Sequence, residues 1–325
     1  MYICLLHKNS FVDFLEKIRQ LAAKLLEKGE VDQVIGFAQG SIPMATSPIA
    51  IRSKQDADKL IFGSTCSLNL ANYVRQQKGK TAVIAKGCDS RNIVTHIVEN
   101  QVQRDQIHII GVPCKGMVDK LKIAALFEDE ITEFNENGDT LVVTSALKQE
   151  TLDKKEYLKD NCRYCTHHNP VLFDEMAGDV VEEAELANPF PDVDEIAGLD
   201  AKDRWAHFEN LTANCIRCYA CKNACPLCYC PTCFVDESGP QWVGKGQDKT
   251  DVQTFHFLRA FHCAGRCTDC GACVEACPMG INVRDFTRKL NKDALDLFGW
   301  EAGLDMAKRP PLDAFSPDDP NDFIK

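Results

Sequence analysis

The sequence has no apolar run long enough to cross a bilayer. Its start, MYICLLHKNSFVDFLEK, lacks the basic stretch followed by an apolar stretch that marks a secretory signal. We therefore expect a cytoplasmic protein without a membrane span. The chain also has no glycine-rich loop of the G-x-G-x-x-G type, no nucleophile–base pattern and no paired-carboxylate motif. These absences argue against substrate chemistry of its own.

Basic residues are too few and too scattered for a nucleic-acid-binding protein. The 37 lysines and arginines are outnumbered by 48 acidic residues, which gives a net charge of −11. A length of 325 residues allows two domains with their own cores. The 18 cysteines are clustered, and no secretory signal accompanies them. This usage indicates metal ligands in a reducing, anoxic cytoplasm more than disulfides.

Eight cysteines form two runs with the spacing C-x2-C-x2-C-x3-C-P, which read CIRCYACKNACP and CTDCGACVEACP. This spacing is typical of proteins with two [4Fe–4S] clusters, in which the fourth cysteine of each run ligates the other cluster. Structural zinc is the alternative, but zinc favours four ligands in two C-x2-C pairs. The predicted ligands are Cys215, Cys218, Cys221 and Cys277 for the first cluster, and Cys267, Cys270, Cys273 and Cys225 for the second.

Short apolar strands alternate with helices in the N-terminal half, which predicts an α/β domain with a mostly parallel sheet. In such sheets ligands bind beyond the carboxyl ends of the strands. The expected strands are 34–38, 81–85, 107–113 and 140–146, and the expected helices are 11–28, 56–75 and 91–101.

Two cysteines follow strands at this ligand-binding edge, Cys88 after 81–85 and Cys114 after 107–113. A C-x2-C pair, Cys162 and Cys165, comes later in the chain and has few structural uses inside the cytoplasm. We expect these four residues to bind a third [4Fe–4S] cluster. Two alternatives stay open: zinc, and buried cysteines at the strand ends that only pack.

The C-terminal half is expected to be an α-helical ferredoxin-like domain because a long helical segment separates the two runs. The predicted division is an α/β domain at 1–180, an acidic linker at 181–203, the ferredoxin domain at 204–292 and an extended tail at 293–325. Three extra cysteines, Cys228, Cys230 and Cys233, exceed what two clusters need. Three roles are open for them: they bind another metal, they supply an alternative ligand to a cluster, or they pack beside the clusters. Packing is also the role expected of Cys263.

Four segments together resemble the β subunits of deazaflavin-coenzyme hydrogenases and dehydrogenases: VIGFAQGSIPMATSP, TAVIAKGCDSRNIV, IHIIGVPC and NCRYCTHHNPVLFDE. The resemblance covers roughly residues 30–180, and the C-terminal half is similar to the helical ferredoxin of heterodisulfide reductase C-type subunits. The combination resembles iron–sulfur subunits of heterodisulfide-reductase-like complexes in anaerobes. It implies FAD at the carboxyl edge of the first sheet, near 87–91 and 111–115, with Lys86, Gly87 and Arg91 as candidate cofactor-binding residues.

Two functions are consistent with these features. The first is an electron-transfer subunit that relays electrons through [4Fe–4S] clusters between a flavoprotein and a reductase or hydrogenase partner. The second, which the resemblance alone suggests, is an FAD-containing subunit that exchanges hydride with a deazaflavin coenzyme or NAD(P)H.

Overall fold

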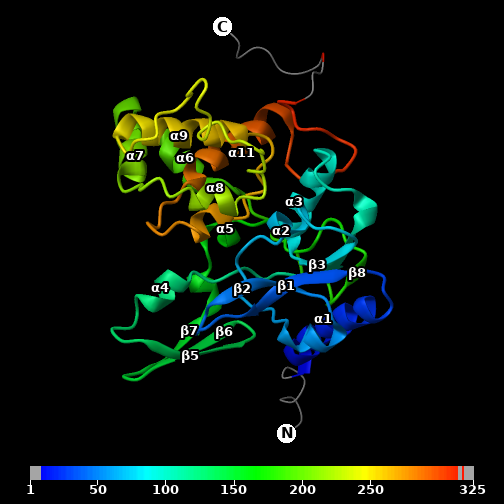
Figure 1. Cartoon of the computed structure of the whole chain (residues 1–325). Helices are drawn as coiled ribbons and strands as arrows, with labels where there is room; N and C mark the ends of the chain where they lie inside the picture. Colours follow the sequence, from blue (N-terminus) through cyan, green and yellow to red (C-terminus); the bar gives the residue numbers. More distant parts are fainter. Residues whose placement is uncertain (1–8, 314–316, 318–325) are drawn as a thin grey trace. The chain divides into compact units, whose positions relative to one another are not determined.

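The computed structural model describes residues 9–313 and residue 317 (Figure 1). Two compact units make up the chain. The first contains the chain up to Ser90 together with Asn100–Leu186, and the second contains Arg91–Glu99 together with the chain from Ala187 onward. The change of unit after Leu186 falls within the predicted linker, whereas Arg91–Glu99 lie inside the segment predicted as the first domain.

A five-stranded sheet forms the centre of the first unit, and it is mostly parallel, as the sequence predicted. The strand order is β2-β1-β3-β4-β8, in which only the β1–β2 pair is antiparallel. All five residues of β3 are buried, as expected for a parallel strand that is covered on both faces. The strands are β1 (Gln33–Gln39), β2 (Thr46–Ile51), β3 (Thr81–Ala85), β4 (Ile107–Gly111) and β8 (Glu175–Met176).

Helix α1 (Asn9–Glu27) matches the predicted helix 11–28 and packs against this sheet (Figure 1). Its Ile18, Ala22 and Leu25 are fully buried because they recur at helical spacing and so share one face. They join residues of β1, β3 and β4 in one apolar core. Burial of these side chains stabilises the fold by about 1.5–3 kcal/mol for each large one.

The predicted strand 140–146 exists but lies in a different sheet. It is β6 (Thr140–Ser145), the centre of an antiparallel sheet with β5 (Ile131–Asn137) and β7 (Gln149–Asp153). Gly138 adopts φ 64° in the tight turn between β5 and β6, a conformation that suits hairpins. The turn therefore pairs β6 with its sequence neighbour and not with the parallel sheet.

The predicted helix 56–75 is wrong. Only the 3-10 helix η1 (Lys54–Lys59) and the short α2 (Ala71–Val74) form there, with a loop between them. The Asn69 side chain accepts a hydrogen bond from the Ala71 N–H, and Asp89 accepts one from the Leu70 N–H. Such side-chain bonds compete with a continuous helix. The other elements are α3 (Gly87–Val98), η2 (Arg104–Gln106), α4 (Lys120–Ala124), η3 (Lys154–Tyr157) and α5 (Asp160–Arg163).

The second unit contains helices and, over its described part, no strand. Asp200 and Asp248 cap two of the helices by accepting backbone N–H bonds. Among the residues that the structure describes, no helix combines the length and the apolar character that a bilayer crossing requires. Besides residues 91–98 of α3, the helices are α6 (Pro191–Gly198), α7 (Ala201–Ala213), α8 (Ala220–Ala224), α9 (Lys249–His262), α10 (Ala272–Glu275) and α11 (Arg284–Phe298).

Helix α6 lies inside the stretch predicted as a linker. Pro191 begins it and two aspartates occupy its first turn, which favours a helix start. Buried Arg288 of α11 binds the Asp192 carboxylate at 2.7 Å and the Pro189 carbonyl at 2.6 Å. Part of the predicted tail is also packed, since Trp300 donates to the Gly265 carbonyl. Residues 314–316 and 318–325 of that tail lie outside the described residues.

We expect Arg288→Met to lower the free energy of unfolding of the second unit by about 1.5–3 kcal/mol, because it removes charge-assisted hydrogen bonds to the half-buried carboxylates of Asp192 and Asp269. Thermal unfolding of the anaerobically purified chain measures the loss. Lys289→Met is the control, since its neighbouring ion pair with Asp293 is exposed. Equal stability of the two variants would contradict the role of Arg288.

Candidate metal centres

The two cysteine runs fold in the same way. The second and fourth residues after the first cysteine are left-handed in both runs: Arg217 and Tyr219 have φ 51° and 60°, and Asp269 and Gly271 have φ 55° and 72°. A short helix then begins, α8 in the first run and α10 in the second. This shared turn brings the first three cysteines of a run to one side of the loop.

The turns also point backbone N–H groups at cysteine sulfurs. Arg217 N–H donates to Cys215 Sγ and Asp269 N–H donates to Cys267 Sγ, both at 3.4 Å. The Arg217 guanidinium fixes its own turn by donating to the carbonyls of Gly244 and Gly246. N–H groups that point at sulfur stabilise the thiolate and tune the metal that it binds.

A cavity in the second unit is lined by all four predicted ligands of the first cluster. Three of them come from the first run, and the fourth, Cys277, comes from the end of the second run, so the fold brings this set together. The ligand assignment itself stays a prediction. Besides Cys215, Cys218, Cys221 and Cys277, the lining is Ile216, Arg217, Tyr219, Phe255, His256, Met279, Ile281 and Val283.

His256 of α9 lies in this cavity with its Nε2 atom 3.2 Å from Cys215 Sγ. Burial lowers its pKa to about 4, and the charges of Arg259 and Arg217 contribute further. The ring is therefore neutral near pH 7, and in the tautomer with the proton on Nε2 it donates to the sulfur. This contact was not predictable from the sequence because 41 residues separate His256 from Cys215.

Cys225 groups with the first three cysteines of the second run. Burial is the main reason that the pKa values of Cys267 and Cys273 rise to about 12 and about 11, and negative charge on Cys225 raises both further. The pKa of Cys270 is also raised well above its usual range, first by burial and then by Cys225. Several thiolates at such a buried place require a compensating cation, which a metal supplies.

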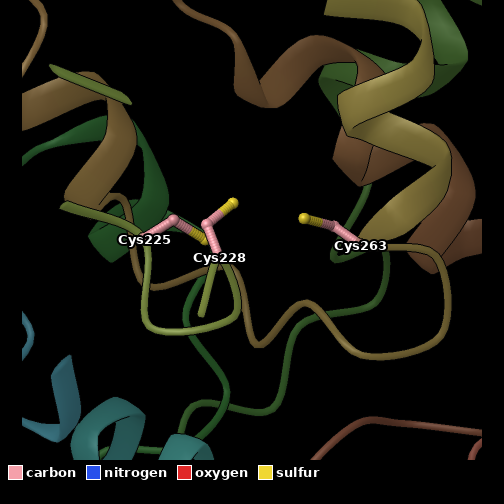
Figure 2. A group of neighbouring side chains, drawn as sticks. All are labelled: Cys225, Cys228 and Cys263. Atoms are coloured by element: carbon pink, nitrogen blue, oxygen red, sulfur yellow. The ribbon is translucent and has the colours of Figure 1, made fainter. Parts of the chain in front are cut away.

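Cys225 has two further sulfur neighbours, Cys228 and Cys263, and the three Sγ atoms lie within 4.8 Å of one another (Figure 2). Cys263 was predicted to be a packing residue, yet its sulfur joins this group at the end of α9. Of the three extra cysteines near the first run, only Cys228 takes part; Cys230 is exposed and Cys233 packs against the apolar core of the second unit.

The predicted third site lies in the first unit. Cys88 is in the first turn of α3, Cys114 follows β4 by three residues, and Cys162 is on α5 with Cys165 just after it. Gly116 N–H donates to Cys114 Sγ at 3.4 Å, and Met117 N–H donates to Cys162 Sγ at 3.3 Å. The sulfurs of Cys114 and Cys162 thus accept bonds from consecutive backbone N–H groups.

Charge interactions involve three of these four cysteines, Cys88, Cys114 and Cys162. Burial raises the pKa of Cys114 to about 11, negative charge on Cys162 adds to the rise, and Lys86 opposes it. The pKa of Lys86 is raised in turn: burial lowers it, but Asp89, Cys88 and Cys114 outweigh burial. Cys165 donates to the His167 carbonyl at 3.5 Å. Lys86 is therefore a buried cation that faces Cys88 and Cys114.

The three residues expected to bind flavin all have roles inside the protein. Buried Lys86 pairs with Asp89 at 2.9 Å, and Arg91 donates to the Ala302 carbonyl at 2.7 Å and pairs with Glu301 at 2.9 Å. A Cβ on Gly87 would lie 2.2 Å from the His167 carbonyl oxygen. Their contacts give a phosphate-binding role no geometric support, so that role stays a prediction.

No protein-family model matches the chain. It is 24% identical to the F420-dependent formate dehydrogenase subunit beta of Methanocaldococcus jannaschii, over 89% of this chain and 91% of that one. It is 25% identical to the F420-dependent formate dehydrogenase 1 subunit beta of Methanococcus maripaludis, over 90% of this chain and 92% of that one. The predicted resemblance to deazaflavin-coenzyme dehydrogenase β subunits is confirmed, and it extends well beyond residues 30–180.

A solved structure from Methanosarcina barkeri, the xenon-derivatized F420-reducing [NiFe] hydrogenase complex, contains a chain 15% identical to this one. The match covers 48% of this chain and 63% of that chain, less than two thirds of its length, with a TM-score of 0.35. This score is too low to define a common fold.

We expect Gly87→Ala to destabilise the first unit by about 1–3 kcal/mol, because the new Cβ would overlap the His167 carbonyl and push the segment after Cys165 away from α3. Thermal unfolding measures the change. Gly198→Ala is the control, since no atom lies within 4 Å of the Cβ that it would add. A Gly87→Ala variant as stable as the parent would show that the close approach is not needed.

Proposed function

We propose that this chain is an iron–sulfur electron-transfer subunit of a multi-subunit redox complex in an anoxic cytoplasm, with two [4Fe–4S] clusters in its second unit. The observation that carries the proposal is the cavity in which Cys277 of the second run joins Cys215, Cys218 and Cys221 of the first. In proteins with two clusters and this cysteine spacing, the fourth cysteine of each run binds the cluster of the other run. The second unit is, on this proposal, an α-helical ferredoxin-like domain.

The clusters, when bound, supply one-electron transfer, and the protein's contribution is to hold, shield and tune them. Eight thiolates bind the iron. Phe255, Ile281 and Val283 line the first site with apolar surface and limit access of water. Buried Arg259 and the N–H groups that point at sulfur offset the negative charge, which favours the reduced state.

A third [4Fe–4S] cluster on Cys88, Cys114, Cys162 and Cys165 is part of the proposal. The support is the pair of backbone N–H bonds to Cys114 and Cys162 and the charge of Lys86 beside Cys88 and Cys114. Zinc would also fit a set of four cysteines. Iron and acid-labile sulfide separate the options: about twelve irons per chain mean three clusters and about eight mean two.

The names of the relatives favour a dehydrogenase as the partner complex, since both are β subunits of F420-dependent formate dehydrogenases. Hydrogenase and heterodisulfide-reductase-like subunits are the other partners that the sequence suggested. The same names support a second candidate function, an FAD subunit that exchanges hydride with a deazaflavin coenzyme. Release of about one FAD per chain on denaturing the anaerobically purified protein would establish it, and a flavin-free protein would leave the electron-transfer function alone.

The ligand crossing is tested by combining cysteine variants. Cys277→Ala and Cys218→Ala should each remove one cluster, or about four irons, and the double variant should lose no more than either single variant. Cys277→Ala with Cys270→Ala should lose about eight. Iron analysis and electron paramagnetic resonance of the dithionite-reduced samples measure these losses.

Cys230→Ala is the matched control, because Cys230 is exposed and lies among the extra cysteines. It should keep the full iron content. If Cys277→Ala and Cys270→Ala together lose only one cluster, the two residues share a cluster and the crossing is wrong. A parent protein isolated without oxygen that contains no iron would overturn the proposed function as a whole.

We expect His256→Phe to lower the reduction potential of the first cluster by roughly 20–60 mV. The variant removes a hydrogen bond to Cys215 worth about 0.5–1.5 kcal/mol, and that bond favours the more negative, reduced cluster. Potentiometric titration followed by electron paramagnetic resonance measures the shift. His262→Phe, on the same helix and exposed, should leave the potential unchanged; equal shifts in both variants would contradict the role of His256.

A further inference from the structure

One cluster of metal-ligating side chains is not explained by two ferredoxin clusters. Cys225, Cys228 and Cys263 come from two separate elements, the loop after α8 and the end of α9, and their Sγ atoms all lie within 4.8 Å of one another. Figure 2 shows the three side chains pointing toward one another. Among the described residues, no other group of three or more cysteine, histidine or acidic side chains meets so closely.

The backbone holds the three positions in place. Cys225 and Cys228 form a C-x2-C pair in a turn closed by a hydrogen bond from Cys228 N–H to the Cys225 carbonyl at 3.1 Å. Cys263 N–H donates to the Ala260 carbonyl at 3.0 Å and ends α9. Local backbone structure fixes each of the two segments, the fold brings the three sulfurs together, and their spacing does not depend on long flexible side chains.

This spacing suits a single metal ion. Zinc–sulfur bonds of about 2.3 Å in a tetrahedron place neighbouring sulfurs about 3.8 Å apart. This separation is shorter than the 4.8 Å within which the three Sγ atoms lie. Soft thiolate ligands select ions such as Zn²⁺ and Cu⁺ over harder divalent ions. A cubane differs, because each of its four cysteines binds a separate iron.

The charge at this place is compatible with a metal–thiolate group in addition to the second cluster. Arg259 lies one turn before Cys263 on α9 and is only 4% exposed. Its guanidinium donates to the Cys221 carbonyl at 3.1 Å, its Nε has no hydrogen-bond partner in the described chain, and no carboxylate of that part pairs with it. A buried cation needs a countercharge. Three thiolates with one divalent ion carry a net charge of −1, which Arg259 would neutralise.

We propose that Cys225, Cys228 and Cys263 bind one thiophilic metal ion, Zn²⁺ or Cu⁺, in a site beside the second iron–sulfur cluster. The sharing of Cys225 with that cluster rests on the proposed function; its thiolate has lone pairs for both metals and bridges them. The ion ties the loop after the first run to α9. In the tetrahedral case, three protein ligands leave a fourth position for water or a small ligand.

The test uses the full chain purified without oxygen and dialysed against metal-free buffer. Elemental analysis should find about one zinc or one copper per chain in addition to iron. The same measurement distinguishes zinc from copper. X-ray absorption at the edge of the metal found should show sulfur neighbours, at about 2.3 Å for zinc. Because this signal is element-specific, the iron–sulfur clusters do not obscure it.

Variants decide which residues hold the ion. Cys228→Ala and Cys263→Ala should lose the zinc or copper completely while keeping the parent's iron and sulfide content. Cys230→Ala, two residues from Cys228 and exposed, should keep both. Cys228→Ser and Cys263→Ser serve as second variants if an alanine variant does not fold.

The proposal is overturned if the parent contains no zinc or copper, or if the ion persists in the Cys228 and Cys263 variants. Loss of iron in those variants would also overturn it, since Cys228 or Cys263 would then be a cluster ligand. These outcomes differ from failure of the proposed function, which is an absence of iron from the parent itself.

Discussion

The burial of cysteine sulfur beside positive charge is the interaction on which this structure depends. Burial opposes ionisation of several predicted ligand thiols, and it raises the pKa of Cys114 and Cys273 to about 11. Lys86 in the first unit and Arg259 in the second lie beside these sulfurs although both cations are buried. Arg259 has no carboxylate partner among the described residues and therefore requires thiolates as its anions, whereas Lys86 pairs with Asp89 and faces the sulfurs as well. Thiolates that bind metal satisfy the cysteines and the cations together.

The two runs obey the same local rules because their cysteine spacing is the same. Spacing dictates a turn, and the turn dictates left-handed residues at equivalent positions, so Arg217 matches Asp269 and Tyr219 matches Gly271. Tyr219 takes a conformation that costs a non-glycine residue about 1–2 kcal/mol. Its ring packs on Phe255 at 5.2 Å, and its hydroxyl accepts from Arg217, so tertiary contacts offset the strain. The central strands were predictable, because β3 and β4 are mostly apolar and largely buried.

Long-range contacts account for what the sequence could not predict. Cys263 was predicted to pack, although it lies four residues before the second run, and only the fold brings its sulfur to Cys225. Arg91 follows a strand, as a phosphate ligand would, yet it binds the carbonyl of Ala302, far along the chain. Helix α6 lies in the predicted linker, and the contact with Arg288 of α11 that stabilises its start is not visible in the sequence. In each case the deciding partner is more than thirty residues away.

The similarity to formate dehydrogenase β subunits has a structural consequence, because it spans about nine tenths of the chain. An alignment of that extent includes residues of both units, so the α/β unit and the helical unit are not two unrelated modules joined by chance. The first unit contributes a parallel sheet whose carboxyl edge carries Cys88 and Cys114, and the second contributes the two runs. Each unit thus brings its own buried cation and its own set of sulfurs. Buried sulfurs beside a buried cation therefore occur twice within one polypeptide.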